Sequence, residues 1–141
     1  MSNENSCFYC EKDQRLDDLM IKISKLQAST VYLFREQTYK GRCVVAYDKH
    51  VKELYELNAE ELAAFMGDVT KVARAIQKAF GADKINYGAF SDKLPHLHFH
   101  IVPKYEGGYS WGGTFEMNPS NNLKLSNEEY NDIIAAIKAN L

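Results

Sequence analysis

Three of the four histidines in this sequence fall within five consecutive residues, at His96, His98 and His100. Large apolar residues separate them, and on a β-strand such strict alternation would point all three imidazoles to one face. On a helix the same spacing would spread them over about 200° of the circumference. Neighbouring imidazoles disfavour each other's positive charge, so they stay neutral near pH 7, the form that attacks an electrophile or binds a metal.

This pattern by itself leaves three interpretations open. The histidines could simply be a polar strand face whose side chains form hydrogen bonds. They could together bind one metal ion, as in His-x-His zinc sites. Alternatively, at least one of them performs covalent chemistry as a nucleophile.

Strands and turns that could position the histidines surround them in the sequence. Residues 84–90 and 97–102 are predicted strands, joined by the polar turn 91–93 and bounded by Pro95 and Pro103. Residues 30–34 and 42–47 are rich in β-branched and aromatic side chains and flank a turn that carries Gly41, which predicts a hairpin.

Helical patterns lie on both sides of these strands. The apolar spacing from Asn58 to Phe80, with Glu61 completing a capping box and Gly81 as a stop, predicts a long helix. Ser126 and Glu129 predict the start of a closing helix. Apolar residues at helical spacing also predict a first helix over 16–26. The mixed order predicts an α+β fold with an antiparallel sheet.

Length and composition limit the possible classes of protein. The 141 residues are predicted to form a single domain, residues 1–141, with an irregular C-terminal tail from about 104. A net charge of −2 gives no basic field for nucleic acid or an anionic membrane, and no stretch of ~18 apolar residues occurs. With no recognisable secretion signal, we expect a cytoplasmic protein whose three cysteines are reduced thiols.

The segment His96-Leu97-His98-Phe99-His100-Ile101-Val102 satisfies every position of the signature of the histidine triad (HIT) family, and the sequence resembles that family over about 100 residues. Cys7-Phe8-Tyr9-Cys10, the Lys40-Gly41 turn and Asn86-Tyr87-Gly88 extend the likeness. The resemblance implies the HIT-like fold, with one long helix and a C-terminal helix, and a homodimer.

The resemblance also implies a reaction. In the family, the residue matching His98 attacks the α-phosphorus of a purine nucleotide and forms a nucleotidyl-histidine, while the residue matching His100 bonds to the phosphate oxygens. The implied substrates are dinucleoside polyphosphates or nucleoside phosphoramidates. A covalent intermediate splits one difficult displacement into two easier ones.

A structural zinc ion is implied by four further matches. Related bacterial proteins hold zinc with an N-terminal Cys-x-x-Cys, a histidine in mid-chain and the first histidine of the triad. The matching residues here are Cys7, Cys10, His50 and His96. Two thiolates and two imidazoles form a closed tetrahedral zinc site.

Nucleotide-binding residues are also carried over from the resemblance. Phe8, Tyr9 and Phe34 match the wall around a base, Glu36 matches the residue on the ribose hydroxyls, and Asn86 matches a residue near the phosphate. Trp111, in the glycine-rich tail loop, is expected to cover the nucleotide or a dimer partner, or to pack within the tail.

One segment departs from the family pattern. Residues 91–93 are Ser-Asp-Lys, where phosphoramidase relatives usually have Gly-Gln-Ser. Lys93 could neutralise phosphate charge and favour a polyphosphate leaving group, or belong to a solvated turn. Two alternative functions therefore stay open: a nucleotide-binding or sensing protein with weak catalysis, and a metal-dependent hydrolase that uses all three histidines.

Overall fold

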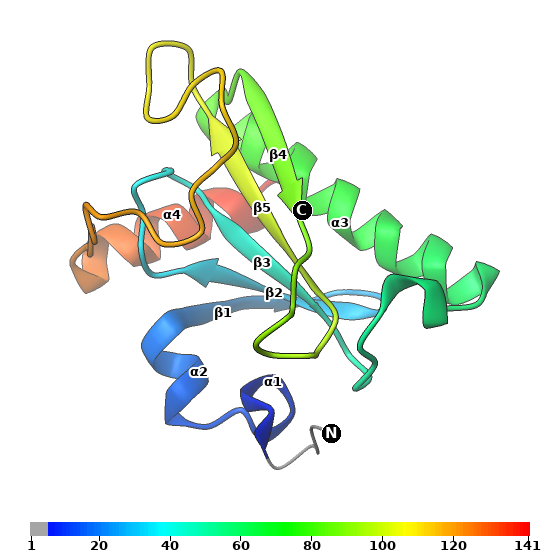
Figure 1. The fold of residues 1–141 in the computed structure, drawn as a ribbon. Helices are drawn as coiled ribbons and strands as arrows, with labels where there is room; N and C mark the ends of the chain where they lie inside the picture. The colour runs from blue at the N-terminus through cyan, green and yellow to red at the C-terminus, as the bar shows by residue number, and fades with distance from the viewer. Residues whose placement is uncertain (1–5) are drawn as a thin grey trace.

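The computed structural model describes residues 6–141, which form a five-stranded antiparallel sheet with helices on both of its faces (Figure 1). The strand order is β1-β2-β3-β5-β4, and every neighbouring pair is antiparallel. This confirms the predicted α+β class. The elements are α1 (Phe8–Glu11), α2 (Gln14–Leu19), β1 (Met20–Lys25), β2 (Ser29–Phe34), β3 (Cys43–Tyr47), the 3-10 helix η2 (Leu54–Glu56), α3 (Ala59–Phe80), β4 (Lys84–Gly88), β5 (His98–Lys104) and α4 (Asn127–Lys138).

The long helix α3 has the predicted ends. The side chain of Asn58 accepts from the backbone N–H of Glu61, and the carboxylate of Glu61 accepts in return from the N–H of Asn58. At the other end, Gly81 has a φ of 67°, a left-handed conformation that stops a helix and that glycine adopts without steric cost. The helix is thereby fixed over the sheet.

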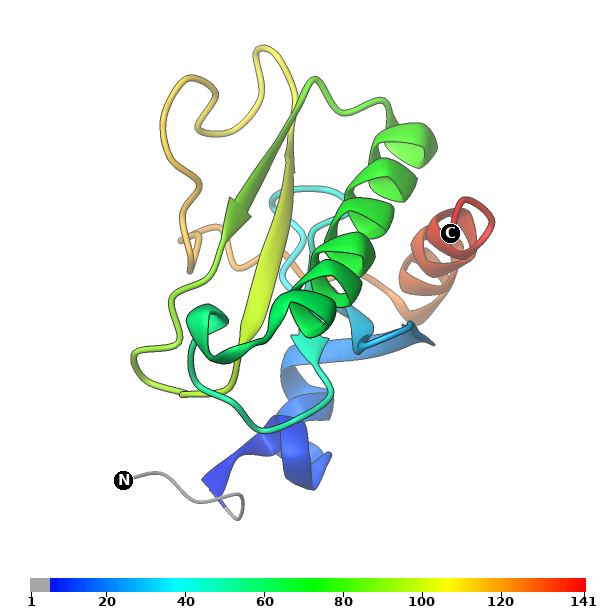
Figure 2. The same cartoon turned by 90° about the vertical axis from the view of Figure 1, so that its right-hand side faces the viewer.

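Helices α3 and α4 lie side by side on one face of the sheet (Figure 2). Phe65 and Ile76 of α3 and Ile137 of α4 are fully buried there against strand residues such as Val31 and Ile101. Burying apolar side chains of this size contributes about 1.5–3 kcal/mol each. This core gives the site strand β5 a rigid support.

A second, smaller cluster covers the opposite face of the sheet. It joins the N-terminal helices to the strands: Cys7, just before α1, Tyr9 of α1 and Leu16 of α2 pack against Tyr32 and Val44. The N-terminal segment therefore lies on the face that α3 and α4 leave free. Figure 1 shows α1 and α2 below the sheet, near the loop that leads from β4 into β5.

Strand β5 places two of the clustered histidines on this second face. His98 pairs with Ala46 of β3 and His100 with Val44, while Phe99 and Ile101, which point the other way, pack with the core under α3. His96 lies before the first residue of β5. The predicted alternation therefore holds for His98 and His100, and His96 belongs to the loop that enters the strand.

The predicted first helix over 16–26 is wrong in its second half. Only Gln14–Leu19 is helical, and Met20–Lys25 is the edge strand β1, paired with β2. Met20 is buried on the face of the histidines and Ile23 on the opposite face. A register shift between Lys22 and Ser24 adds a residue to the strand. Burial on both faces together with this bulge produced the three-residue spacing that imitates a helix.

The remaining differences concern the ends of elements. Strand β4 stops at Gly88, and β5 runs through Pro103 to Lys104 because its pairing with β3 ends at Ile101 and leaves that edge free. In the irregular tail that follows, the buried ammonium of Lys104 donates to the carbonyl of Ser110.

No helix within residues 6–141 is long and apolar enough to span a bilayer.

Candidate functional site

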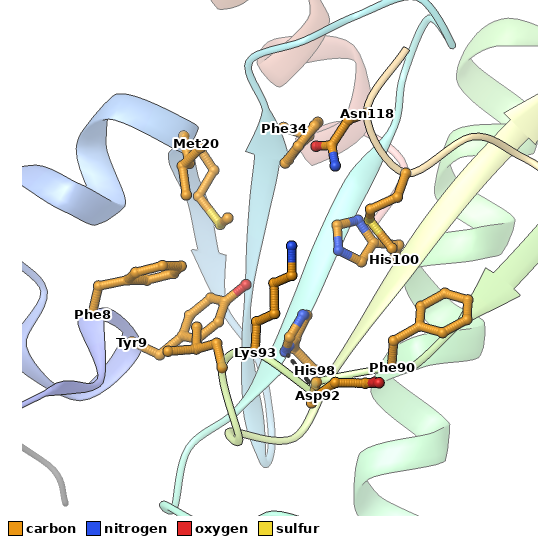
Figure 3. Close-up of a pocket in the computed structure, with 14 residues that line it drawn as sticks. Phe8, Tyr9, Met20, Phe34, Phe90, Asp92, Lys93, His98, His100 and Asn118 are labelled. Carbon is orange, nitrogen blue, oxygen red and sulfur yellow. Dashed lines mark hydrogen bonds between the residues drawn. The ribbon is translucent and has the colours of Figure 1, made fainter. Parts of the chain in front are cut away.

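A pocket of about 460 Å³ opens on the face of the sheet that carries His98 and His100 (Figure 3). Its walls come from the N-terminal helices, the end of β2, the loop before β5 and the tail. The lining residues are Phe8, Tyr9, Leu19, Met20, Phe34, Phe90, Ser91, Asp92, Lys93, Leu94, His98, His100, Met117 and Asn118. The lining combines apolar walls with a few polar groups, as ligand sites usually do.

His98 has a defined tautomer. Its Nδ1 lies 2.7 Å from the carbonyl oxygen of His96 and 3.2 Å from the hydroxyl of Ser91. Because a carbonyl only accepts, Nδ1 carries the proton and Nε2 keeps a free lone pair. Burial lowers the pKa of His98, which favours this neutral form. His98 is therefore built as a neutral imidazole with one nucleophilic nitrogen.

His100 has the opposite tautomer. Its Nδ1 lies 3.0 Å from Nη2 of Arg42, and a guanidinium only donates, so Nδ1 accepts and the proton is on Nε2. Burial, the charge of Arg42 and the neighbouring His98 together lower the pKa of His100 to about 2. The two rings stand 5.4 Å apart, centroid to centroid. One strand thus presents a lone pair and an N–H donor side by side.

Aromatic rings form the wall opposite to the histidines. Phe8 and Tyr9 come from α1, and their rings lie 4.8 Å apart. The ring of Tyr9 also lies 5.0 Å from that of His98, while Phe34 meets the edge of His100 at 5.5 Å. Aromatic side chains that line a pocket offer faces on which a nucleobase can stack.

Residues 91–93, the segment that differs from the family pattern, line the pocket. Ser91 has a φ of 63°, a left-handed conformation that is uncommon outside glycine, and this turn directs the next two residues toward the pocket. In the view of Figure 3, the ammonium of Lys93 lies between the aromatic wall and the two imidazoles. Asp92 and Lys93 both line the pocket, so the site carries one carboxylate and one ammonium beside its two neutral histidines.

Four side chains next to the pocket could hold a metal ion. The ligand atoms of Cys7, Cys10, His50 and His96 all lie within 4.8 Å of one another. Nδ1 of His96 is 3.3 Å from Sγ of Cys7, 3.6 Å from Sγ of Cys10 and 3.3 Å from Nδ1 of His50. Zinc–ligand bonds of about 2.0–2.3 Å in a tetrahedron imply edges of roughly 3.3–3.8 Å, a range that these three separations match.

The surroundings of His96 support the same conclusion. Its Nε2 lies 2.7 Å from the carbonyl oxygen of Tyr47, so Nε2 carries the proton and Nδ1 offers its lone pair to the group. Within the described part of the chain, the three histidines of the cluster do not form a shared ligand set, because the one metal-ligating group found there contains only His96 of the three.

Glu36 and Asn86, expected from the resemblance, and Trp111, for which the sequence left several roles open, lie outside the pocket. The carboxylate of Glu36 accepts from the N–H and the hydroxyl of Thr38 and from the N–H of Leu123, so it ties the tail to the end of β2. Asn86 is on β4, opposite Val102, and does not line the pocket. Trp111 is 41% exposed in the tail loop and does not line it either.

Other residues near the pocket were not expected. Met117 and Asn118 close it from the irregular tail, where no periodic pattern indicates what they face. Nη2 of Arg42 contacts Nδ1 of His100, and the side chain of Arg42 is completely buried. Arg42 directly precedes the apolar run of β3, but its partner His100 lies on another strand, so no local pattern indicated the contact.

A family model described as "HIT domain" matches residues 18–107 of this chain. The adenosine 5'-monophosphoramidase hnt1 of Schizosaccharomyces pombe is 28% identical over 112 residues, which are 76% of this chain and 80% of that protein. The asymmetrical bis(5'-nucleosyl)-tetraphosphatase of the same yeast is 30% identical over 92 residues, covering 62% of this chain and 50% of that protein.

Solved structures are similar over nearly the whole chain. A histidine triad protein from Sinorhizobium meliloti superposes with a TM-score of 0.81 at 27% identity, covering 92% of this chain and 95% of that one. A Zn-bound histidine triad family protein from Mycobacterium smegmatis superposes with a TM-score of 0.67 at 21% identity, covering 97% and 96%. At 21% identity, the similarity to the Mycobacterium smegmatis protein concerns the fold alone.

Proposed function

Because the chain belongs to the histidine triad (HIT) family, we propose that it hydrolyses a nucleotide substrate at the α-phosphorus, with His98 as the nucleophile. The observation that carries the proposal is the pair of opposite tautomers on β5: a lone pair on Nε2 of His98 and an N–H on Nε2 of His100. Two curated relatives are named as hydrolases of nucleotide substrates, which supports the same class of reaction.

In the first step of the proposed reaction, Nε2 of His98 forms a bond to phosphorus as the bond to the leaving group breaks. A polyphosphate leaves as an anion with the electron pair of that bond, whereas an amine leaving group also takes up a proton from solvent. The imidazole then carries a positive charge, since Nδ1 still holds its proton. The carbonyl oxygen of His96, 2.7 Å from Nδ1, lies where it stabilises that charge. The N–H on Nε2 of His100 donates to a phosphate oxygen, whose negative charge it stabilises.

In the second step, water forms a new bond to phosphorus as the bond to His98 breaks. The electron pair of that bond returns to Nε2, and the nucleoside monophosphate takes up the hydroxyl of the water while its proton is released to solvent. His98 is restored with its original tautomer because the His96 carbonyl holds the Nδ1 proton throughout. No redox partner is required.

The aromatic wall is proposed to hold the purine base. Phe8, Tyr9 and Phe34 line the same pocket as His98 and His100, so a base stacked on them would have its phosphate within the pocket that β5 lines. Lys93 is proposed to contact the leaving group. Glu36 and Asn86 are left out of the proposed site because they lie away from the pocket.

Zinc is the metal that we propose for Cys7, Cys10, His50 and His96. Two thiolates and two imidazoles are the donor set of closed structural zinc sites, and the four ligand atoms are close enough for one ion. Bound zinc would supply a crosslink that holds α1 against the loop before β5. The residues proposed for the reaction lie outside this group. A cytoplasmic location, which keeps thiols reduced, suits these ligands.

A homodimer is proposed through β4 and α3. Among residues 6–141, strand β4 pairs only with β5, so its outer edge is available for pairing with a second copy. Tyr87 on β4 is 50% exposed, and Leu62 on α3 is also exposed. Light scattering on the purified chain tests this proposal: twice the mass of 16.1 kDa supports it, and the monomer mass contradicts it.

The function is tested by trapping the covalent step. The chain is mixed with diadenosine tetraphosphate or adenosine phosphoramidate carrying labelled adenylate, quenched in alkali, and digested for mass spectrometry. Adenylate on the peptide that contains His98, together with released AMP, supports the proposal. The matched control is His98→Ala, which keeps the other pocket-lining residues and should bind AMP without turnover.

The experiment also separates the alternative functions. AMP binding without turnover of either substrate identifies a nucleotide-binding protein, the second function favoured by the departure at residues 91–93. Turnover that persists in His98→Ala and disappears with a chelator identifies a metal-dependent hydrolase. Either result contradicts the proposed mechanism.

A further inference from the structure

Arg42, immediately before β3, is a buried cation that forms no ion pair. Its side chain is completely shielded from solvent, and the ion pairs in the described part of the chain involve other residues. Its Nε is buried without a hydrogen-bond partner. Burial lowers the pKa of Arg42 to about 10 although the charge of Glu36 opposes this. A residue that served only to fill space would not carry this desolvation cost.

The guanidinium is held rigidly between two aromatic rings. Its Cζ lies 4.2 Å from the ring centre of Phe34 and 5.4 Å from that of Phe115. Nη1 donates to the carbonyl of Glu116 at 3.3 Å. Gly88 makes room for this arrangement, because a Cβ there would lie 2.7 Å from Cζ of Phe115. Nη2 of Arg42 lies 3.2 Å from Sδ of Met117 and also contacts one further partner.

That partner is Nδ1 of His100, 3.0 Å from Nη2 of Arg42. His100 lines the pocket, and among the described residues no group other than Arg42 forms a hydrogen bond with its ring. Without a donor at Nδ1, the neutral ring would be free to place its single proton on either nitrogen. In one of these two forms, Nε2 would present a lone pair to the phosphate in place of a donor.

We propose that Arg42 is a positioning residue that holds the proton of His100 on Nε2, so that this nitrogen donates toward an anion in the pocket. The catalytic benefit rests on the proposed function, but the tautomer itself does not. The same strand needs opposite tautomers at His98 and His100, and the carbonyl of His96 and the guanidinium of Arg42 are the groups that impose them.

The direct test is the tautomer of His100 by two-dimensional ¹H–¹⁵N NMR of the ¹⁵N-labelled full chain at pH 7.5. In the native protein the Nδ1 shift of His100 should be that of an unprotonated nitrogen and the Nε2 shift that of an N–H. In Arg42→Met the two shifts should move toward each other as both tautomers become populated. Arg42→Lys, whose ammonium is also only a donor, should retain more of the native pattern.

The matched control is Phe115→Leu, which loosens the packing around the guanidinium and keeps the donor. It should leave the tautomer of His100 largely unchanged. A native spectrum with the proton on Nδ1 overturns the proposal, even if Arg42→Met fails to fold. An unchanged native pattern in a folded Arg42→Met protein overturns it as well.

Kinetics provide the second readout. Removing one preorganised donor from a developing anion costs about 10²–10³-fold in kcat, so Arg42→Met should lower kcat by that order with a smaller change in KM. An equal loss in Phe115→Leu would contradict a role through His100. If the native chain hydrolyses no nucleotide, the proposed function fails while the NMR result still decides the role of Arg42.

Discussion

The carbonyl oxygen of His96 accepts a hydrogen bond from Nδ1 of His98 over a distance of 2.7 Å. His96 is thus connected to two sites at once. Its ring contributes Nδ1 to the group that could bind a metal, and its main chain orients the ring proposed as the nucleophile. A residue of the loop before β5 therefore connects the metal site with the pocket.

Ser91 contributes less to this orientation than the carbonyl does. Its hydroxyl lies 3.2 Å from Nδ1 of His98 and donates to the His96 carbonyl at 3.3 Å. Ser91→Ala removes a hydrogen bond worth about 0.5–1.5 kcal/mol, so kcat should fall about 2- to 12-fold. Steady-state hydrolysis of adenosine phosphoramidate checks this. A loss as large as that of His98→Ala would mean that the hydroxyl itself reacts.

Metal content should depend on the cysteines of α1. Purified protein should contain zinc in stoichiometric amount, and the Cys7→Ser and Cys10→Ser variants should lose it. Inductively coupled plasma mass spectrometry measures the metal content. Cys43→Ala is the control, because that thiol is buried in the main core, away from the group. Metal that depends on His98 and survives Cys7→Ser would contradict the assignment.

Loss of the metal should also weaken nucleotide binding. Phe8 and Tyr9 stand between Cys7 and Cys10, so the ligands hold the aromatic wall. Calorimetric titration with AMP should give a larger Kd for Cys7→Ser than for Cys43→Ala. Equal affinities would show that α1 keeps its place without the metal.

The base should be held by stacking. Phe8→Ala should raise KM about 5- to 150-fold and leave kcat nearly unchanged, since stacking on an aromatic ring contributes about 1–3 kcal/mol per base. The control is Tyr55→Ala, because Tyr55 is 84% exposed and lies outside the pocket. A fall in kcat at constant KM would place the base elsewhere.

Lys93 should influence the choice of leaving group. Lys93→Gln should lower kcat/KM for diadenosine tetraphosphate by about 1.4- to 5-fold, the worth of one exposed charge pair, because its leaving group is a polyphosphate. Adenosine phosphoramidate, which releases ammonia, should be hydrolysed as before. Lys52→Gln is the control outside the pocket. Equal losses on both substrates would argue for a structural role.

Acid should destabilise the protein through His100. Its pKa is about 2 in the folded chain and ordinarily 6.5, with Arg42 and His98 as the groups that face it. Below pH 6.5 the unfolded chain therefore binds a proton that the folded chain does not. The contribution of His100 to the free energy of unfolding is therefore complete above pH 6.5 and falls as the pH is lowered. Between pH 7 and pH 5 the loss is about 2 kcal/mol.

The matched variant is His100→Gln, whose side-chain oxygen can still accept from Arg42. Urea unfolding of both proteins at pH 7 and pH 5 should show a loss of stability that is about 2 kcal/mol smaller in the variant. The same acid-dependent loss in both proteins would mean that His100 is protonated in the folded chain.

Local signals predicted the helices that have complete start and stop residues. Asn58 with Glu61, and Ser126 with Glu129, form the capping boxes that begin α3 and α4. The first helix over 16–26 failed because the apolar spacing of β1 comes from burial on both faces and a bulge, which only the pairing with β2 produces.

The candidate site could be predicted in part, for a similar reason. The period of two around His98 and His100 is a local property of β5, so their common face was predictable. Arg42 was not, because its contact with His100 joins residues 58 positions apart and depends on the register of β3 against β5. Met117 and Asn118 approach through a tail without periodic structure.

The group of Cys7, Cys10, His50 and His96 has a consequence for the order of synthesis. Cys7 and His96 are 89 positions apart, so at ~5–20 residues per second the thiols leave the ribosome roughly 4–18 s before their last partner. During that interval the two thiols have no complete group of four ligands in which to bind a metal ion, and they are exposed to oxidants. The proposed metal site can therefore be completed only after the loop before β5, which carries His96, has been synthesised.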